Sequence, residues 1–165
     1  GPVINERQLQ NMLTAIRQAQ ADGARVLTGG HRLEDDAHRD GFYLAPTLIE
    51  QADPGDPISR DELFGPITCL YRVSGFEEAL ELANESPFGL TCAIHTSNLH
   101  RAMRYAAKMR SGLVSINGFT YGSEPHMPFG GLKQSGNGLR EPGPEAIDVY
   151  SAQKNVLIQT DPTAV

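Results

Sequence analysis

The clearest candidates for chemistry lie in one short acidic segment, Asp61-Glu62-Leu63-Phe64-Gly65-Pro66. A carboxylate accepts two hydrogen bonds at once and can therefore grip a vicinal diol such as a ribose. An aromatic ring two residues further on can lie against a flat heterocycle. A solvated acidic turn closed by Gly-Pro has the same composition, and from the residues alone that plainer interpretation is the commoner one.

A second candidate is the glycine-rich segment 125–143, which shows neither a strand period nor a helical period. A loop of this length is usually functional or disordered. Its apolar residues favour an ordered loop laid across a site: Met127, Phe129, Leu132 and Leu139. Lys133 does not follow a phosphate-loop order, and Gly136-Asn137-Gly138 lacks the third glycine of a dinucleotide fingerprint, so neither motif is present.

Other common catalytic patterns are missing. The histidines form no i, i+4 pair and have no cysteine partner at metal spacing, so we expect no metal site. No serine lies in a G-x-S-x-G context. Cys69 and Cys92 lie inside apolar segments and are predicted to be reduced, packed thiols.

The length, charge and composition further limit the class of protein to which the chain can belong. At 165 residues the chain is predicted to be one domain or a domain with an appendage. A formal charge of −6 argues against nucleic acid as a partner. No apolar run is long enough to span a membrane, and no secretory signal opens the chain. We therefore expect a cytoplasmic protein.

Hydrophobic periodicity predicts the elements. Leu9, Met12, Leu13 and Ile16 mark an amphipathic helix that ends at Gly23. Strands are expected at 25–27 and 41–49, with Pro46 at a sheet edge or a bulge.

Further along, strands at 66–73, 89–96 and 113–116 alternate with helices at about 74–85 and 98–110. The first of these helices is predicted to begin with a capping box formed by Ser74 and Glu77. Alternation of this kind predicts an α/β fold with two successive βαβ units, parallel strands and right-handed crossovers. Ligands collect beyond the carboxyl ends of such strands, and the loop that starts at Asn117 leaves from one. Residues 144–150 are expected to form helical turns and 154–159 a terminal strand that needs a partner sheet.

Several ordered motifs together resemble the C-terminal portion of the NAD(P)-dependent aldehyde dehydrogenase superfamily, over nearly the whole chain in one register. The motifs are Gly1-Pro2-Val3-Ile4-Asn5, Glu62-Leu63-Phe64-Gly65-Pro66, Ala83-Asn84, Gly89-Leu90, Gly112-Leu113-Val114-x-Ile116-Asn117, Pro128-Phe129-Gly130-Gly131-x-Lys133-x-Ser135-Gly136-x-Gly138 and Arg140-Glu141-x-Gly143.

The resemblance implies roles for individual residues. Glu62 matches the glutamate that binds the nicotinamide-side ribose, and Phe64 matches the aromatic residue beside the nicotinamide. Phe129 matches the aldehyde tunnel wall, while Phe119 and Tyr121 occupy the loop that shapes substrate choice.

Two further positions follow from the same resemblance. Asn117 matches a loop anchor. Glu141 matches a glutamate proposed to order the hydrolytic water, and Leu139 is one extra residue here relative to commoner members of the family. For Phe64 and Phe129, ordinary core packing is the alternative.

The family's chemistry also needs a cysteine nucleophile, which forms a thiohemiacetal, and a general-base glutamate. Neither Cys69 nor Cys92 lies in the nucleophile context. The chain therefore resembles about the last third of such an enzyme, and we expect it to be inactive alone, with NAD or NADP bound only in the full-length parent.

The expected organisation is a partial catalytic domain at 1–150 and an oligomerisation strand and tail at 151–165. The expected partners are a small aldehyde, the rest of the parent enzyme and further copies of the chain through the terminal strand. A separately expressed, non-enzymatic oligomerisation or interaction module is the alternative. Two features resemble the branch that oxidises semialdehydes of small organic acids: the approach His126-Met127 to Phe129 and the variant Gly136-Asn137-Gly138-Leu139-Arg140-Glu141.

Overall fold

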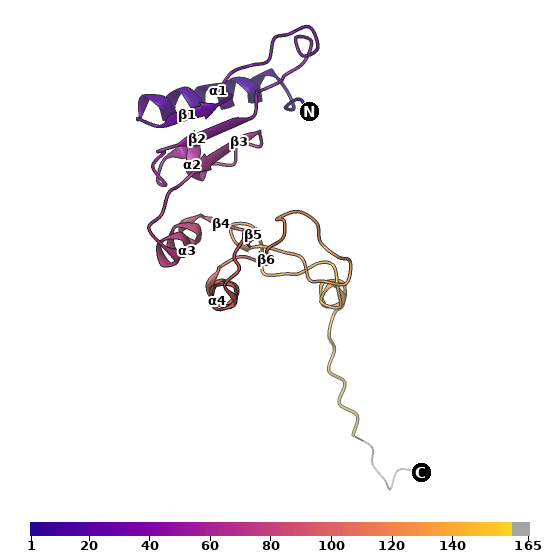
Figure 1. The fold of residues 1–165 in the computed structure, drawn as a ribbon. Helices are drawn as coiled ribbons and strands as arrows, with labels where there is room; N and C mark the ends of the chain where they lie inside the picture. Colours follow the sequence, from indigo (N-terminus) through magenta and orange to yellow (C-terminus); the bar gives the residue numbers. More distant parts are fainter. Residues whose placement is uncertain (160–165) are drawn as a thin grey trace. The chain divides into compact units, whose positions relative to one another are not determined.

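Figure 1 shows the computed structural model of the chain, which describes residues 1–159. The chain divides into two compact units, the first spanning Gly1–Ser86 and the second beginning at Pro87. This division differs from the predicted boundary at 150/151, which separates a catalytic part from a tail and stays a prediction. We describe each unit by itself.

The first unit opens with the predicted helix, α1 (Glu6–Ala21). Asn5 caps it, because the Asn5 side chain accepts a hydrogen bond of 2.8 Å from the amide of Gln8. Leu9, Met12 and Ile16 are buried on one face, which confirms the helical pattern.

Against α1 lies a three-stranded sheet made of β1 (Arg25–Thr28), β2 (Thr47–Glu50) and β3 (Ile67–Leu70). The strand β2 lies in the centre, antiparallel to β1 and parallel to β3. The edge alternative for Pro46 is therefore wrong, whereas the β1–β2 ladder does contain a bulge-like register shift, between Val26 and Thr28. Pro46 lies just before β2, where its missing N–H costs no ladder hydrogen bond.

Two helices complete the first unit. The short α2 (Pro57–Arg60) was not predicted from the sequence, and α3 (Phe76–Glu85) was. The start of α3 differs from the predicted capping box, since both the amide and the hydroxyl of Ser74 donate to Glu78 instead of Glu77, at 2.7 and 2.5 Å.

The second unit contains β4 (Phe88–Gly89), β5 (Thr91–Ile94), α4 (Leu99–Lys108), β6 (Leu113–Ile116), β7 (Leu132–Lys133) and α5 (Ala146–Tyr150). The strands β5 and β6 are parallel and joined through α4, which confirms the second predicted βαβ unit. The strand β7 lies inside the segment predicted to be wholly loop, and it pairs antiparallel with β4.

The full βαβαβ series is not confirmed. The strand β3 pairs with β2 and not with β5. The sheet that contains β3 is mixed, because β2 is antiparallel to β1 and parallel to β3. The predicted strand 89–96 is also interrupted at Leu90, because Gly89 pairs with Leu132 whereas Thr91 pairs with Leu113. Residues 154–159 form no strand within the described chain, and the rest of the predicted tail, 160–165, lies outside the described residues.

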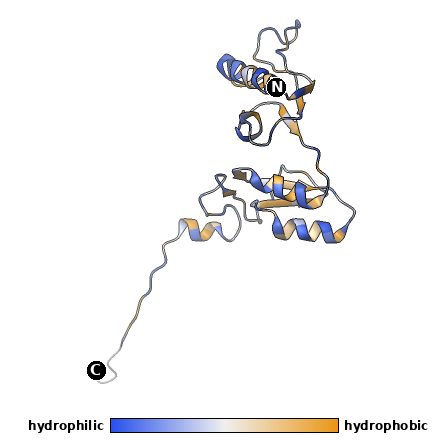
Figure 2. Cartoon of the chain, turned by 90° about the vertical axis from the view of Figure 1, so that its left-hand side faces the viewer, coloured by the Kyte–Doolittle hydropathy of each residue, from blue (hydrophilic) through white to orange (hydrophobic). Residues whose placement is uncertain are grey.

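The hydrophobic core lies in the first unit. Leu9, Met12, Ile16 and Ile49 are its largest fully buried side chains. In Figure 2 apolar and polar segments alternate around the helices, as amphipathic helices require. No helix among residues 1–159 is long and apolar enough to cross a membrane.

Candidate functional site

The loop that carries Glu62 and Phe64 leads from α2 into β3 and is open to solvent. The side chain of Phe64 is 80% exposed, so it does not pack into the core of this chain. Its backbone has a φ of 49°, a left-handed conformation that a bulky residue adopts only when its surroundings hold it there. Such conformations cluster at ligand sites, which makes Phe64 a candidate on structural grounds.

Two contacts with α1 hold this loop in place. The Gln8 side-chain amide donates a hydrogen bond of 2.5 Å to the Leu63 carbonyl. Gly65 packs so closely on the buried Met12 side chain that a Cβ at this position would collide with it. The loop is thus anchored at both residues that flank Phe64, and the ring is left outside.

A cavity of about 280 Å³ accompanies the loop, lined by Ile58, Ile67 and residues 61–65. Within the described part of the chain, no side chain bonds to the Glu62 carboxylate. An exposed carboxylate next to an exposed aromatic ring can hold a diol that is attached to a flat ring.

In the second unit, the loop after β6 is clamped at its start by Asn117. The Asn117 side chain accepts a hydrogen bond from the Thr96 amide at 2.8 Å and donates one to the Thr96 carbonyl at 3.0 Å. Asn117 also has a φ of 56°, a conformation that asparagine tolerates better than most residues. The predicted role of loop anchor is confirmed by these bonds.

The same loop carries two exposed aromatic residues. The rings of Phe119 and Tyr121 stack with centroids 5.0 Å apart and planes inclined at 17°. Tyr121 also lines a cavity of about 610 Å³ together with the start of β6, Glu124 and Met127. The backbone approach at the start of β6 is close, since a Cβ on Gly112 would collide with the Gly130 carbonyl.

The far end of the loop is fixed by a backbone pair. The Phe129 amide donates to the Glu141 carbonyl at 2.9 Å, and the Glu141 amide donates to the Phe129 carbonyl at 2.8 Å. Phe129 is 37% exposed. A hydrogen bond to Glu141 and the negative charge of that carboxylate raise the pKa of Tyr150.

The structure therefore brings Phe129 together with Glu141, and Phe119 together with Tyr121. Glu62 and Phe64 belong to the other unit. Sequence reasoning missed Gln8 and Met12 as supports of the first loop, because a residue pair 55 positions apart leaves no local pattern. It also passed over Glu124, although this is the sole carboxylate between Asn117 and Phe129.

Both thiols are half-buried and donate toward backbone carbonyls. The Cys69 sulfur lies 3.7 Å from the Ile58 oxygen, and the Cys92 sulfur lies 3.5 Å from the Leu113 oxygen. Burial raises the pKa of the Cys69 thiol. This effect outweighs that of the hydrogen bonds with Tyr71 and Ser59, which lower the pKa. A thiol in such a setting is a poor nucleophile at neutral pH.

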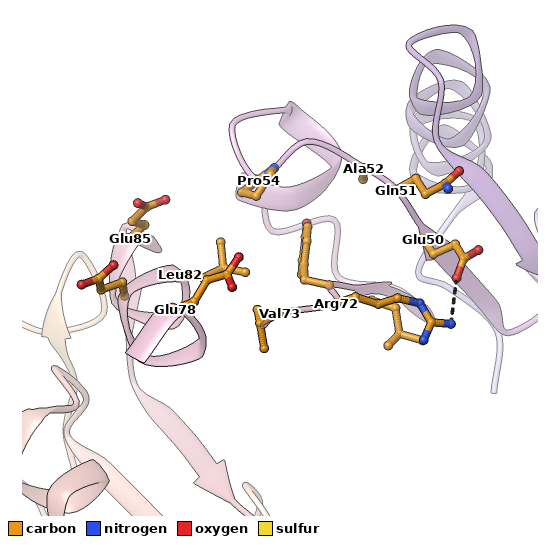
Figure 3. A pocket seen from close by; sticks show the side chains of 12 residues that line it. Glu50, Gln51, Ala52, Pro54, Arg72, Val73, Glu78, Leu82 and Glu85 are labelled. Carbon is orange, nitrogen blue, oxygen red and sulfur yellow. Dashed lines mark ion pairs between the residues drawn. The ribbon is translucent and has the colours of Figure 1, made fainter. Parts of the chain in front are cut away.

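Another cavity, of about 550 Å³, lies in the first unit between the sheet and α3 (Figure 3). The dashed line in Figure 3 joins Arg72 to the buried Glu50, at 3.7 Å, and Arg25 also pairs with Glu50. None of the predicted site residues lines this cavity, so its size alone does not make it the site. Among residues 1–159 no group of three or more metal-ligating side chains gathers.

The chain is thus an α/β protein with an exposed carboxylate and aromatic ring on one loop, and with a stacked aromatic pair beside a cavity on another. A sequence model of the aldehyde dehydrogenase family matches residues 1–156, and the chain belongs to this family.

Several relatives are close in sequence. The alpha-ketoglutaric semialdehyde dehydrogenase of Bacillus subtilis is 37% identical over 96% of this chain and 33% of its own length. The alpha-ketoglutarate semialdehyde dehydrogenase of Haloferax volcanii is 36% identical over 94% of this chain and 33% of its own.

Solved structures agree with the sequence relatives. The crystal structure of betaine aldehyde dehydrogenase from Staphylococcus aureus in complex with NAD+ matches all of this chain with a TM-score of 0.92 and 36% identity. The match covers 32% of that protein. The chain therefore spans about a third of the length of the relatives that it matches.

Proposed function

We propose that this chain is the C-terminal third of an NAD(P)-dependent aldehyde dehydrogenase whose full-length parent oxidises an aldehyde to a carboxylic acid. The observation that carries the proposal is the end-to-end similarity to an aldehyde dehydrogenase solved with NAD+, together with the chain's coverage of only a third of that enzyme. The reaction class is that of the family. The residues named in the next paragraphs supply the part of the chemistry that we assign to this third of the enzyme.

The first loop fits a nicotinamide cofactor. Glu62 would accept hydrogen bonds from the two ribose hydroxyls, and Phe64 would lie beside the nicotinamide ring. The unpaired carboxylate and the exposed, constrained ring support this assignment. When bound, the cofactor supplies the hydride acceptor. NAD and NADP remain equal candidates.

In the second unit, Phe129, Phe119 and Tyr121 would wall the path of the aldehyde and exclude water from it. Glu141 would accept a hydrogen bond from a water molecule and order it for hydrolysis. Its backbone is already paired with that of Phe129, and its carboxylate pairs with the Tyr150 hydroxyl. These contacts would hold the carboxylate beside the tunnel wall.

The isolated chain should be inactive, because the cysteine that forms the thiohemiacetal and the general-base glutamate belong to the part of the family that this chain does not match. Incubation of the 165-residue chain with NAD and a simple aldehyde should produce no NADH. A full-length family enzyme serves as the positive control. Turnover that disappears on replacing Cys69 or Cys92 by serine would overturn the assignment.

Glu62 can be tested in the full-length enzyme that contains this chain. Glu62→Gln should slow single-turnover hydride transfer by about tenfold, since a charged hydrogen bond to the ribose contributes roughly 1.5–3 kcal/mol. Asp61→Asn removes the neighbouring carboxylate and should leave the rate unchanged. Equal rates for wild type and Glu62→Gln would reject the ribose contact.

A separately expressed, non-enzymatic oligomerisation or interaction module is the second candidate. Its support is the exposed apolar segment Val156, Leu157 and Ile158, which are 66%, 83% and 76% exposed. A segment of this kind can add a strand to a sheet of another copy. Sedimentation of the chain should then show a dimer or larger species, and truncation after Ala152 should give a monomer. A monomer at high concentration before truncation would exclude this role.

Two narrower assignments complete the proposal. The two semialdehyde dehydrogenases among the relatives support a lean toward semialdehydes of small organic acids. The cytoplasm is proposed as the location, and fractionation of cells that express the full-length protein tests it.

A further inference from the structure

The cavity in the second unit has one sign of charge. Among its lining residues, the side chains that contribute apolar surface are Leu113, Val114, Met127 and Pro128. Glu124 is the one charged residue among them. Arg140, a cation of the same glycine-rich segment, donates to the Leu139 carbonyl and is not part of this lining.

The position of Glu124 is fixed by the surrounding loop. The Met127 amide donates a hydrogen bond of 2.9 Å to the Glu124 carbonyl, which closes a tight turn. Asn117 clamps the start of the loop, and the backbone pair between Phe129 and Glu141 clamps its end. The backbone of Glu124 is therefore held at the cavity that this residue lines.

The aromatic pair is a second feature that favours cations over anions. Tyr121 lines the cavity, and Phe119 stacks on it. The faces of aromatic rings attract cations and repel anions. A thioether such as that of Met127 tolerates many shapes and adds no charge.

We propose that Glu124 is a specificity-determining residue that selects aldehydes with a cationic ammonium group over aldehydes with a carboxylate. The inference rests on the proposed function, since it takes this cavity as the path of the aldehyde. It runs against the lean toward semialdehydes of organic acids, whose carboxylate would share this cavity with the Glu124 carboxylate.

The expected effect is moderate because the cavity is open to water. At about 6 Å and an effective dielectric constant of about 20, a unit charge pair changes affinity by up to about a hundredfold. Screening by solvent and salt reduces this to about tenfold in each direction.

The test compares three aldehydes of equal chain length in the full-length enzyme that contains these residues, with a terminal trimethylammonium, methyl or carboxylate group. Glu124→Gln should lower kcat/KM about tenfold for the cationic aldehyde and raise it about tenfold for the anionic one. It should leave the uncharged aldehyde unchanged. Glu124→Lys should reverse the preference, and Glu145→Gln, at an exposed carboxylate just before α5, should change none of the three.

Equal effects of Glu124→Gln on all three aldehydes, or no effect on any, would overturn the inference while the proposed function stands. If no aldehyde is oxidised at all, the proposed function fails instead. The charge preference of the cavity itself is then decided on the 165-residue chain by NMR, from the shift of the Met127 methyl resonance. A shift with tetramethylammonium but not with acetate, lost in Glu124→Gln, supports it. The same response to both ions refutes it.

Discussion

The two units anchor their site loops by different physical means. In the first unit, the loop around Phe64 rests on a packed core through Met12 and on a side-chain hydrogen bond from Gln8. In the second unit, the loop between Asn117 and Phe129 is held by hydrogen bonds to backbone groups at its two ends. The two units also differ in the apolar side chains that they bury.

The first unit contains all of the large, fully buried side chains of the described chain. The buried hydrophobic residues of the second unit, among residues 87–159, are Ala102 and Tyr105. A two-stranded parallel sheet such as β5–β6 is normally covered on both faces in complete proteins. The second unit therefore depends more strongly on the rest of the proposed enzyme than the first unit does.

The largest effect should come from removing core volume in the first unit. Met12→Ala deletes a side chain with no exposed surface and should lower the free energy of unfolding by about 2–5 kcal/mol. Met103→Ala, at a methionine on α4 that is 59% exposed, is the matched control and should change it by less than about 0.5 kcal/mol. Urea titration followed by circular dichroism measures both. Equal losses would mean that the core is not concentrated in the first unit.

In the second unit, the anchor Asn117 should matter most. Asn117→Ala removes two hydrogen bonds and leaves alanine at a φ of 56°, for a combined cost of about 2 kcal/mol. Asn117→Gly removes the same bonds without the backbone penalty, so it should cost about 1 kcal/mol less. Hydrogen exchange of the residue 117 amide, which donates to the Ile94 carbonyl at 2.7 Å and keeps this acceptor in both variants, reports the local opening. If the two variants exchange at the same rate, backbone strain has no part in the anchor.

The sequence predicted those elements that depend on local patterns. The apolar spacing around Leu9, Met12 and Ile16 defines α1, and the alternation of β5, α4 and β6 defines a parallel βαβ unit. It did not predict strand partners, because a β-rich segment indicates extension and not which distant strand completes its ladder. The strand β3 is the example, since it pairs with β2.

The candidate site divides in the same way. Motif resemblance nominated Glu62, Phe64, Phe129 and Glu141, whose roles stay predictions, and Asn117 makes the bonds expected of the loop anchor that the resemblance implied. The supports of the first loop remained hidden because they lie on α1, far away in the chain. The capping residue of α3 was placed one position too early, since Glu78 and not Glu77 reaches back to Ser74. Which of the two neighbouring glutamates reaches back depends on the backbone direction at the start of the helix, and not on sequence spacing alone.

A smaller effect should follow from cutting the link between α1 and the Phe64 loop. Gln8→Ala leaves the Leu63 carbonyl without its donor and should destabilise the closed loop by about 1 kcal/mol. Chymotrypsin cleavage after the exposed Phe64 should then be about fivefold faster. Gln10→Ala, on the same helix and bonded only to Glu6, controls for helix propensity. A rate for Gln8→Ala equal to that control would show that the core contact at Met12 suffices to hold the loop.

The smallest effect concerns the interior of the first unit at high pH. Burial raises the pKa of Cys69 above its ordinary value of 9.0 and raises that of Tyr71 above 10.0. A raised pKa in the folded state contributes stability that is present below the unfolded-state pKa and is lost as pH rises through the folded-state value. Stability should therefore begin to fall above about pH 9, with Cys69 leading and Tyr71 adding at higher pH.

Alkylation of Cys69 in a Cys92→Ser background measures this directly, because the thiolate is the reacting species. In the folded chain the rate of reaction with iodoacetamide should reach half its plateau above pH 9.0, and in urea it should do so at a lower pH. Ile58→Ala opens the site at the residue whose carbonyl the thiol faces, and it should move the folded midpoint back toward the urea value. A folded midpoint at or below the unfolded one would mean that water reaches Cys69 freely. In that case the contrast between a first unit whose interior excludes water and a second unit that buries few apolar side chains would not hold at β3.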